Sequence, residues 1–168
     1  GIVDSGNVAV AGNVTLTTDA GNGVINMGTL QQSAGDLILV TNGNGAATVV
    51  NNAAIDFGTS NVGGALDVTA SAGTITQNGG ALTVAGTSAF TTSTNDQAIT
   101  LSNTTNALTG AVAFTTGGTT GNVVIDNGTT GLDLAASTIN GTLTATGGAS
   151  AGIVDSGNVA VAGNVTLT

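Results

Sequence analysis

The chain has no cationic side chain and almost no aromatic one. Lys, Arg and His are absent, as are Cys, Pro, Trp and Tyr, and nine acidic residues give a formal net charge of −9. Nucleic acid is therefore a poor partner, because no group on the surface can neutralise phosphates. The lack of Cys excludes disulfides, and the lack of Lys excludes Lys–Asn isopeptide bonds. The longest aliphatic runs, such as LILV at 37–40, are far shorter than the roughly 18 residues of a membrane-spanning helix.

The same absences argue against an enzyme. A Ser or Thr nucleophile would have no His, Lys or Tyr as its base, and no cationic group would stabilise a developing anion. Two carboxylates can cut a glycosidic bond, but all nine acidic residues are Asp and they occur singly, with no D-D or D-x-D. We therefore expect no enzymatic activity.

Two Asp residues are weak candidates for a metal site. The stretch GTTGLDLA at 128–135 partly resembles the calcium nonapeptide G-G-x-G-x-D-x-U, with Asp133 at the acidic position. Thr129 replaces the second Gly, and the motif occurs once rather than in a stacked array. Asp126, in DNG, reads as a turn former, and Asp133 reads as a solvent-facing strand residue. We expect no cofactor, and at most weak Ca²⁺ binding at these two positions.

Short strand-like tracts separated by Gly and Asn fill the sequence. The abundance of Val, Ile and Thr favours strands, and tracts such as ALDVT at 65–69 alternate apolar with small or polar residues, as a strand with one buried face does. In LDV, IDF and LDL, the side chains of Asp67, Asp56 and Asp133 should point away from the buried face. Gly and Asn between the tracts predict tight corners, because both tolerate a positive φ.

The spacing of the tracts fits two all-β folds. Strand centres about 6–12 residues apart are compatible with a β-sandwich or a β-helix. A sandwich core usually contains Trp, Tyr and Phe, whereas this chain has three Phe and neither of the others. We therefore predict an all-β parallel β-helix (β-solenoid), with about three short strands per coil and coils of roughly 20–25 residues. The candidate core residues are Leu16, Leu39, Val68, Val84, Leu101, Phe114, Ile125 and Leu134.

The beginning of the sequence returns unchanged at its end. Residues 1–17 and 152–168 both read GIVDSGNVAVAGNVTLT, which is typical of a tandem array. We predict one solenoid unit of six or seven coils at 1–151 and the start of the next identical unit at 152–168. An open solenoid end exposes unpaired strand groups and core, so it has to be capped or continued. We expect the next unit or the next subunit to cover it.

A stretch in the middle of the chain carries a family resemblance. Residues 79–118 read GGALTVAGTSAFTTSTNDQAITLSNTTNALTGAVAFTTGG. This stretch resembles the β-strand repeats of filamentous-haemagglutinin-type exoproteins and autotransporter passengers, and the similarity is diffuse and covers most of the chain. It implies a right-handed parallel β-helix that is exported from a bacterium as part of a long fibre.

These features favour an architectural function outside the cell. We expect a structural repeat segment of a secreted or cell-surface bacterial filament, stalk or sheath, with copies of itself or adjacent repeats as end-to-end partners. Neither nucleic acid nor membrane insertion of this segment is expected, and a host or neighbouring-cell surface is a further candidate partner.

Two alternatives remain. An adhesin passenger could bind host glycan or protein through the solenoid flank, which would need a protruding loop or an exposed aromatic patch. The only aromatic residues available for such a patch are Phe57, Phe90 and Phe114. Short subunits could instead assemble into an S-layer-like or matrix filament.

Overall fold

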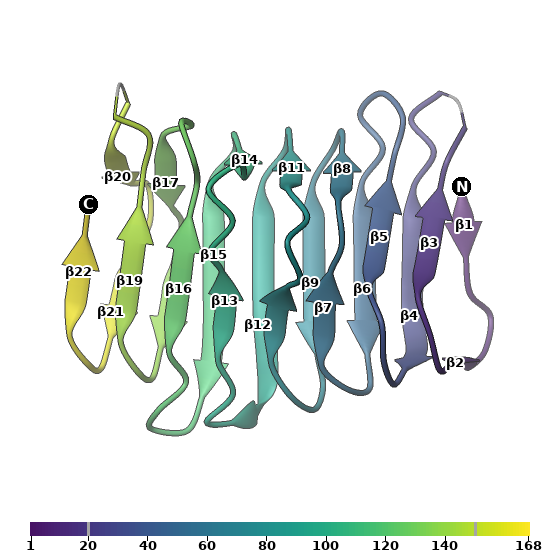
Figure 1. Ribbon diagram of the computed structural model, residues 1–168, viewed down its shortest axis with the longest axis horizontal. Helices are drawn as coiled ribbons and strands as arrows, with labels where there is room; N and C mark the ends of the chain where they lie inside the picture. The colour runs from purple at the N-terminus through teal and green to yellow at the C-terminus, as the bar shows by residue number, and fades with distance from the viewer. Residues whose placement is uncertain (20, 150) are drawn as a thin grey trace.

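The described residues wind into a single coil of parallel strands. The computed structural model describes residues 1–19, 21–149 and 151–168, and the regular structure in them consists of twenty-two short strands. In Figure 1 the strands of the nearer sheet point up and those of the farther sheet point down while the chain advances from right to left, which makes the coil right-handed. Nothing in the described residues forms a helix that is long and apolar enough to cross a membrane.

The strands form two sheets that face each other. Sheet A contains β1 (Ile2–Val3), β2 (Val8–Val10), β4 (Ile25–Gln32), β6 (Ala47–Asn51), β9 (Leu66–Ala70), β12 (Ser88–Asn95), β15 (Val112–Gly117), β17 (Leu132–Leu134), β18 (Ser137–Ile139), β20 (Ile153–Asp155) and β21 (Val159–Val161). Sheet B contains β3 (Val14–Thr17), β5 (Leu37–Val40), β7 (Ile55–Phe57), β8 (Ser60–Val62), β10 (Ile75–Gln77), β11 (Leu82–Val84), β13 (Ile99–Leu101), β14 (Ala107–Leu108), β16 (Val123–Asp126), β19 (Leu143–Thr146) and β22 (Val165–Leu167). Each coil contributes two or three strands, so the predicted parallel β-solenoid is confirmed.

Successive coils place their residues in columns across each sheet. One column of sheet A contains Ile2, Ile25, Ala47, Leu66, Ser88, Val112, Leu134 and Asp155. The steps along this column are roughly 19–24 residues, shortest from Ala47 to Leu66 and longest from Ser88 to Val112. The coil length therefore varies around the predicted value, which is why no exact short period is visible in the sequence.

The second copy of the duplicated segment does not return to the same column. Ile153 is the counterpart of Ile2, but it pairs with Leu132, two residues before the column that Ile2 begins. That column passes through Leu134 and ends at Asp155. Relative to the columns of paired residues, the second copy therefore lies two residues behind the position of the first copy.

The side chains that point between the two sheets form one narrow core. Seven of the candidate core residues are buried there, namely Leu39, Val68, Val84, Leu101, Phe114, Ile125 and Leu134. The eighth, Leu16, is only partly buried and packs against the core from its edge. The reason is its position, because Leu16 lies on the first coil, which has a neighbouring coil on one side only.

Three aromatic rings fill the middle of the core. The rings of Phe90 and Phe114 stack with centroids 5.8 Å apart, and Phe57 meets Phe90 edge-on at 6.3 Å. All three side chains are fully buried. Phe90 and Phe114 lie on neighbouring strands of sheet A, and Phe57 reaches Phe90 from sheet B on the other side of the core.

A column of glycines forms one corner of the coil. The N–H of Gly64 donates to the carbonyl of Gly45 at 2.9 Å, and the N–H of Gly86 donates to the carbonyl of Gly64 at 3.0 Å. A Cβ atom at Gly64 would lie 2.9 Å from the carbonyl carbon of Gly45, which leaves no room for a side chain. These glycines have ordinary φ values, whereas Gly35 and Gly118 at other turns have φ of 81°. The predicted positive φ thus explains only some of the corners, and close backbone approach explains this one.

Candidate functional site

Asparagine side chains complete the hydrogen bonding at corners where a strand partner is missing. Asn51 is fully buried, and its Oδ1 accepts from the N–H of Gln32 at 2.8 Å while its Nδ2 donates to the carbonyl of Gln32 at 2.9 Å. The side-chain amide thus acts as a peptide group of a neighbouring strand would. Asn127, which directly follows β16 in sheet B several coils later, makes the same pair of bonds to the N–H and carbonyl of Leu108. The sequence pattern does not single out these residues, because Asn also occurs at exposed turns.

Threonine hydroxyls connect each turn to the next coil. The Oγ1 of Thr41 donates to the carbonyl of Gly45 at 2.6 Å and accepts from the N–H of Gly63 at 2.9 Å. Thr116 makes the equivalent pair of bonds in a later coil, to the carbonyl of Gly121 and from the N–H of Asn140. Each hydroxyl therefore closes its own turn and holds the coil that follows.

Exposed acceptors on the turns also bind backbone N–H groups of the following coil. The carboxylate of Asp4 accepts from the N–H and Oγ1 of Thr29 at 2.7 and 2.8 Å and from the N–H of Gly28 at 3.1 Å. These bonds, led by the Thr29 N–H, lower the pKa of Asp4 below its ordinary 3.8, because they favour the charged carboxylate. The amide oxygen of Asn13 likewise accepts from the N–H of Asp36 at 3.0 Å.

Asp96 forms the same kind of contact in the middle of the solenoid. Its carboxylate accepts from the N–H of Thr119 at 2.7 Å and from the N–H and Oγ1 of Thr120 at 2.9 and 3.1 Å. The Thr119 N–H is the first cause of a lowered pKa at Asp96, followed by the Thr120 N–H and hydroxyl. At Asp4, Asn13 and Asp96 the acceptor thus lies on one coil and its donors on the next. The buried Asn51 and Asn127 bind in the opposite sense, to the preceding coil.

The two candidate metal ligands lie in different sheets. Asp126 ends β16 in sheet B and its Oδ1 accepts from the N–H of Gly128 at 2.8 Å, as a turn former does. Asp133 lies on β17 in sheet A, between the buried Leu132 and Leu134. Within the described residues, no three acidic or other ligand side chains gather as a metal site would require. Weak Ca²⁺ binding stays a prediction.

The flank of the solenoid offers hydroxyls rather than aromatic rings. Thr69, Thr91, Thr115 and Thr138 follow one another in register on sheet A. The Phe side chains that an aromatic binding patch would need are all in the core. The outer face that the structure describes is therefore polar and built from small side chains.

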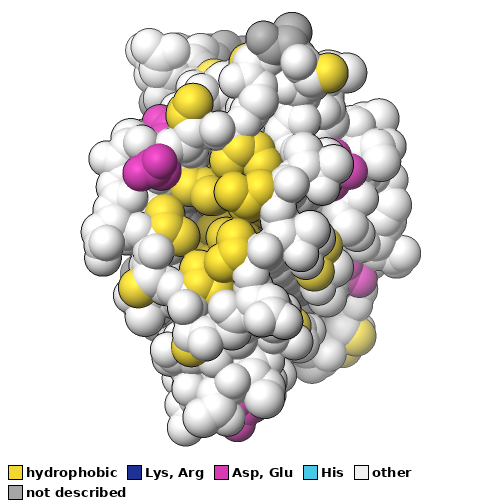
Figure 2. Space-filling view, turned by 90° about the vertical axis from the view of Figure 1, so that its left-hand side faces the viewer, with side chains coloured by type: hydrophobic (Ala, Val, Ile, Leu, Met, Phe, Trp, Pro, Cys, Tyr) yellow, Lys and Arg dark blue, Asp and Glu magenta, His cyan; other side chains and the backbone are white. Residues whose placement is uncertain are grey.

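An apolar surface lies at the C-terminal end of the solenoid. Figure 2 looks along the axis at this end and shows hydrophobic side chains gathered in its centre. They line a hollow of about 410 Å³, whose apolar lining includes Leu134, Leu143, Ile153, Val159, Val161, Val165 and Leu167. This hollow is the open end of the core, and most of its lining belongs to the duplicated segment 152–168.

Comparison with known proteins identifies a repeat family. The family described as repeats of unknown function (DUF5649) matches over residues 44–115 and over residues 120–168. No curated protein and no solved structure matches the chain.

Proposed function

We propose that the chain, which belongs to the family of repeats of unknown function (DUF5649), is a structural repeat segment of a secreted or cell-surface bacterial fibre. In this proposal the fibre is a filament, stalk or sheath in which coil stacks on coil. The observation that carries the proposal is the continuous pairing of both sheets from the first coil to the last. A rod whose neighbouring coils are hydrogen-bonded along one axis suits a part that spans distance, because this bonding resists bending.

Charge and side-chain size on the flank support a solvated rod. Asp67 is exposed on sheet A, and Asp56 lies on the outward face of sheet B. Outward charges keep sheets from pairing side by side, which would otherwise bundle such rods. The absence of Lys and Arg also leaves trypsin no cleavage site, a useful property for an extracellular part.

The two alternatives assign a different use to the same rod. Adhesion through the flank has less support, since Phe57, Phe90 and Phe114 are all buried. A filament of short subunits also needs coils stacked end to end, and its mass separates it from a giant tandem chain. An intact species near 15.7 kDa would indicate subunits, and a far larger species would indicate tandem repeats.

Immunogold electron microscopy with antibodies against residues 1–168 tests the proposal. Intact, unpermeabilised cells that produce the chain should carry gold along surface filaments. A matched strain from which this segment is deleted in frame is the control and should carry none. Label confined to the cytoplasm of sectioned cells would exclude a fibre on the cell surface.

A further inference from the structure

The two copies of the duplicated segment provide an internal comparison. Val14 and Val165 occupy the same place in identical sequences, but Val14 is 7% exposed and Val165 is 51% exposed. The difference arises because β3 pairs with β5, which places Leu37 opposite Val14. A following coil therefore converts this surface from exposed to buried.

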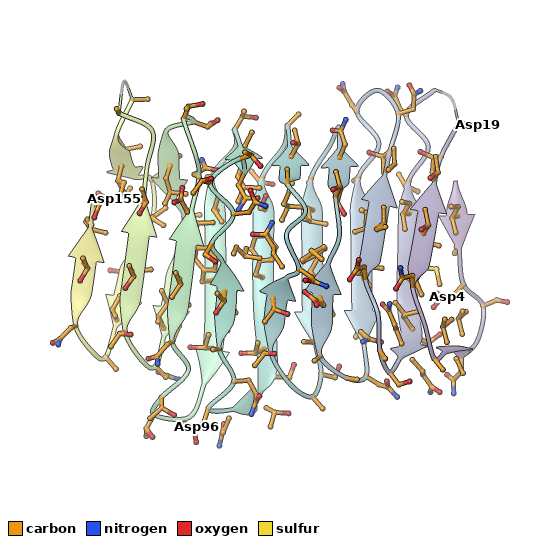
Figure 3. The ribbon with its side chains drawn as sticks, viewed as in Figure 1. Asp4, Asp19, Asp96 and Asp155 are labelled. Atoms are coloured by element: carbon orange, nitrogen blue, oxygen red, sulfur yellow. The ribbon has the colours of Figure 1, made fainter. Side chains whose placement is uncertain are left out.

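The polar acceptors of the two copies differ in the same way. In the first copy, the carboxylate of Asp4 and the amide oxygen of Asn13 accept hydrogen bonds from the coil that follows. Their counterparts are Asp155 and Asn164, whose side chains accept no hydrogen bond from any described residue. Figure 3 shows Asp4 near the N-terminal end of the solenoid and Asp155 near the C-terminal end. The C-terminal end thus exposes the same apolar side chains and hydrogen-bond acceptors that a following coil covers and binds at the first copy.

The covering segment at the first copy is known residue by residue. Ile25 lies opposite Ile2, Leu30 opposite Val8, and Leu37 opposite Val14. These three covering side chains are 0–1% exposed. They come from β4 and β5, within residues 23–40.

We infer that the C-terminal hollow receives a second copy of the repeat unit, which follows in tandem in the same chain. The segment equivalent to residues 23–40 covers Ile153, Val159 and Val165 in the register seen at the first copy. The carboxylate of Asp155 then accepts from the counterparts of the Gly28 and Thr29 N–H groups. This inference rests on the proposed function and specifies how two units of the fibre join. It depends on the identity of residues 1–17 and 152–168, and not on where the sequence stops. We call the contact between residues 152–168 and the segment that covers them the joint.

Charge distinguishes this occupant from a separate chain that stacks by its own first coil. In-register stacking of residues 1–17 on residues 152–168 would place one Asp4 carboxylate beside Asp155, and like charges on adjacent strands repel. The segment 23–40 instead presents backbone N–H groups and the Thr29 hydroxyl at that position, as it does at the first copy.

A thiol probe at Val165 tests the joint, because the chain has no cysteine of its own. Val165→Cys is made in the 168-residue chain and in a two-unit chain, in which residues 1–168 are continued by a second copy of residues 18–168. Val14→Cys is the matched control in both. In the 168-residue chain, the thiol should react with a neutral alkylating reagent about tenfold or more faster at position 165 than at position 14, because exposure governs access. In the two-unit chain, the rate at position 165 should fall to that at position 14.

Two alanine substitutions test the same joint by thermal stability, without a reactive thiol. Asp155→Ala should lower the Tm of the two-unit chain and leave the Tm of the 168-residue chain unchanged. Asp4→Ala should lower the Tm in both chains, since its carboxylate is bonded in both.

The results separate this inference from the fibre proposal. Equal thiol reactivity at position 165 in both chain lengths, or an Asp155→Ala variant that is silent in the two-unit chain, would overturn the joint. Protection of position 165 in the 168-residue chain that grows with protein concentration would also overturn it, because the occupant would then be a separate chain. Cytoplasmic immunogold label would overturn the fibre and leave the joint intact.

Discussion

The side-chain amide of Asn127 binds the backbone of Leu108, one coil earlier, through both of its polar atoms. Oδ1 accepts from the Leu108 N–H at 2.8 Å, and Nδ2 donates to the Leu108 carbonyl at 2.9 Å. Nδ2 also donates to the carbonyl of Gly131 at 2.8 Å. Because Asn127 is fully buried, water cannot replace these bonds, and the corner depends on this one side chain.

Asn127→Leu should therefore destabilise the solenoid strongly. It leaves the two buried backbone groups of Leu108 without this partner, and the half-buried Gly131 carbonyl as well. Each buried group costs about 1–3 kcal/mol, so the free energy of unfolding should fall by roughly 2 kcal/mol or more. Urea unfolding followed by circular dichroism measures the change. Asn44→Ala, at an exposed turn, is the control and should stay within about 0.5 kcal/mol. Equal effects of the two substitutions would contradict this role of Asn127.

The glycine corner provides a second test. Gly64→Ala places a Cβ against the backbone of the preceding coil, so the coils must separate locally. Overpacking of this kind costs about 1–3 kcal/mol. Gly6→Ala is the matched control, because a Cβ at Gly6 meets no atom within 4 Å. Urea midpoints should fall for Gly64→Ala alone, and a neutral Gly64→Ala would show that the corner has room to spare.

Truncating one of the three packed aromatic rings should strongly reduce the stability of the solenoid. Phe90 contacts both Phe57 and Phe114 in the core, so Phe90→Ala leaves a cavity that is lined from both sheets. We expect a loss of about 3–5 kcal/mol for this truncation. Phe90→Leu fills part of the volume and should cost less than Phe90→Ala. Differential scanning calorimetry gives the order, with the exposed Val154→Ala as the control.

Acid should weaken the contacts between coils. The pKa of Asp96 is lowered in the folded chain relative to the ordinary 3.8, so its charged form is favoured by folding. The stability that it contributes is complete above the ordinary value and is lost as pH falls through the lower, folded value. Urea midpoints measured from about pH 6 to about pH 2 should therefore decline at the acidic end.

Asp96→Asn removes this titration and should flatten that decline. Asn suits the position because φ of Asp96 is 62°, a region that Asn tolerates. Asp67→Asn, on the exposed face of β9, is the control and should retain the wild-type slope. A wild-type slope in Asp96→Asn would mean that the bonds to Thr119 and Thr120 do not carry the pH dependence.

The strand pattern could be predicted because alternation is a local property. In LDV the two apolar residues, Leu66 and Val68, are buried, and Asp67 between them is exposed. The same alternation places Ile55 and Phe57 inside. The spacing of such tracts, together with the scarcity of aromatic residues, favours the solenoid, and the coil length is predicted by analogy with known repeat architectures.

The polar contacts between coils could not be predicted, because they depend on register. Asn127 and Asn44 are the same residue type beside glycine, yet one is buried and the other is exposed. Steps of variable length prevent one coil from being aligned on the next by sequence alone. Leu16 shows the related limit for the core, since its partial exposure is set by the number of neighbouring coils and not by its own strand.

The two-residue offset between the duplicated segments has a consequence for any long array. Ile153 pairs with Leu132, whereas the column from Ile2 passes through Leu134, so each new unit would begin slightly further back around the axis. Equivalent side chains on successive units would then trace a slow spiral instead of a straight stripe. An epitope present once per unit would face every direction in turn along the rod.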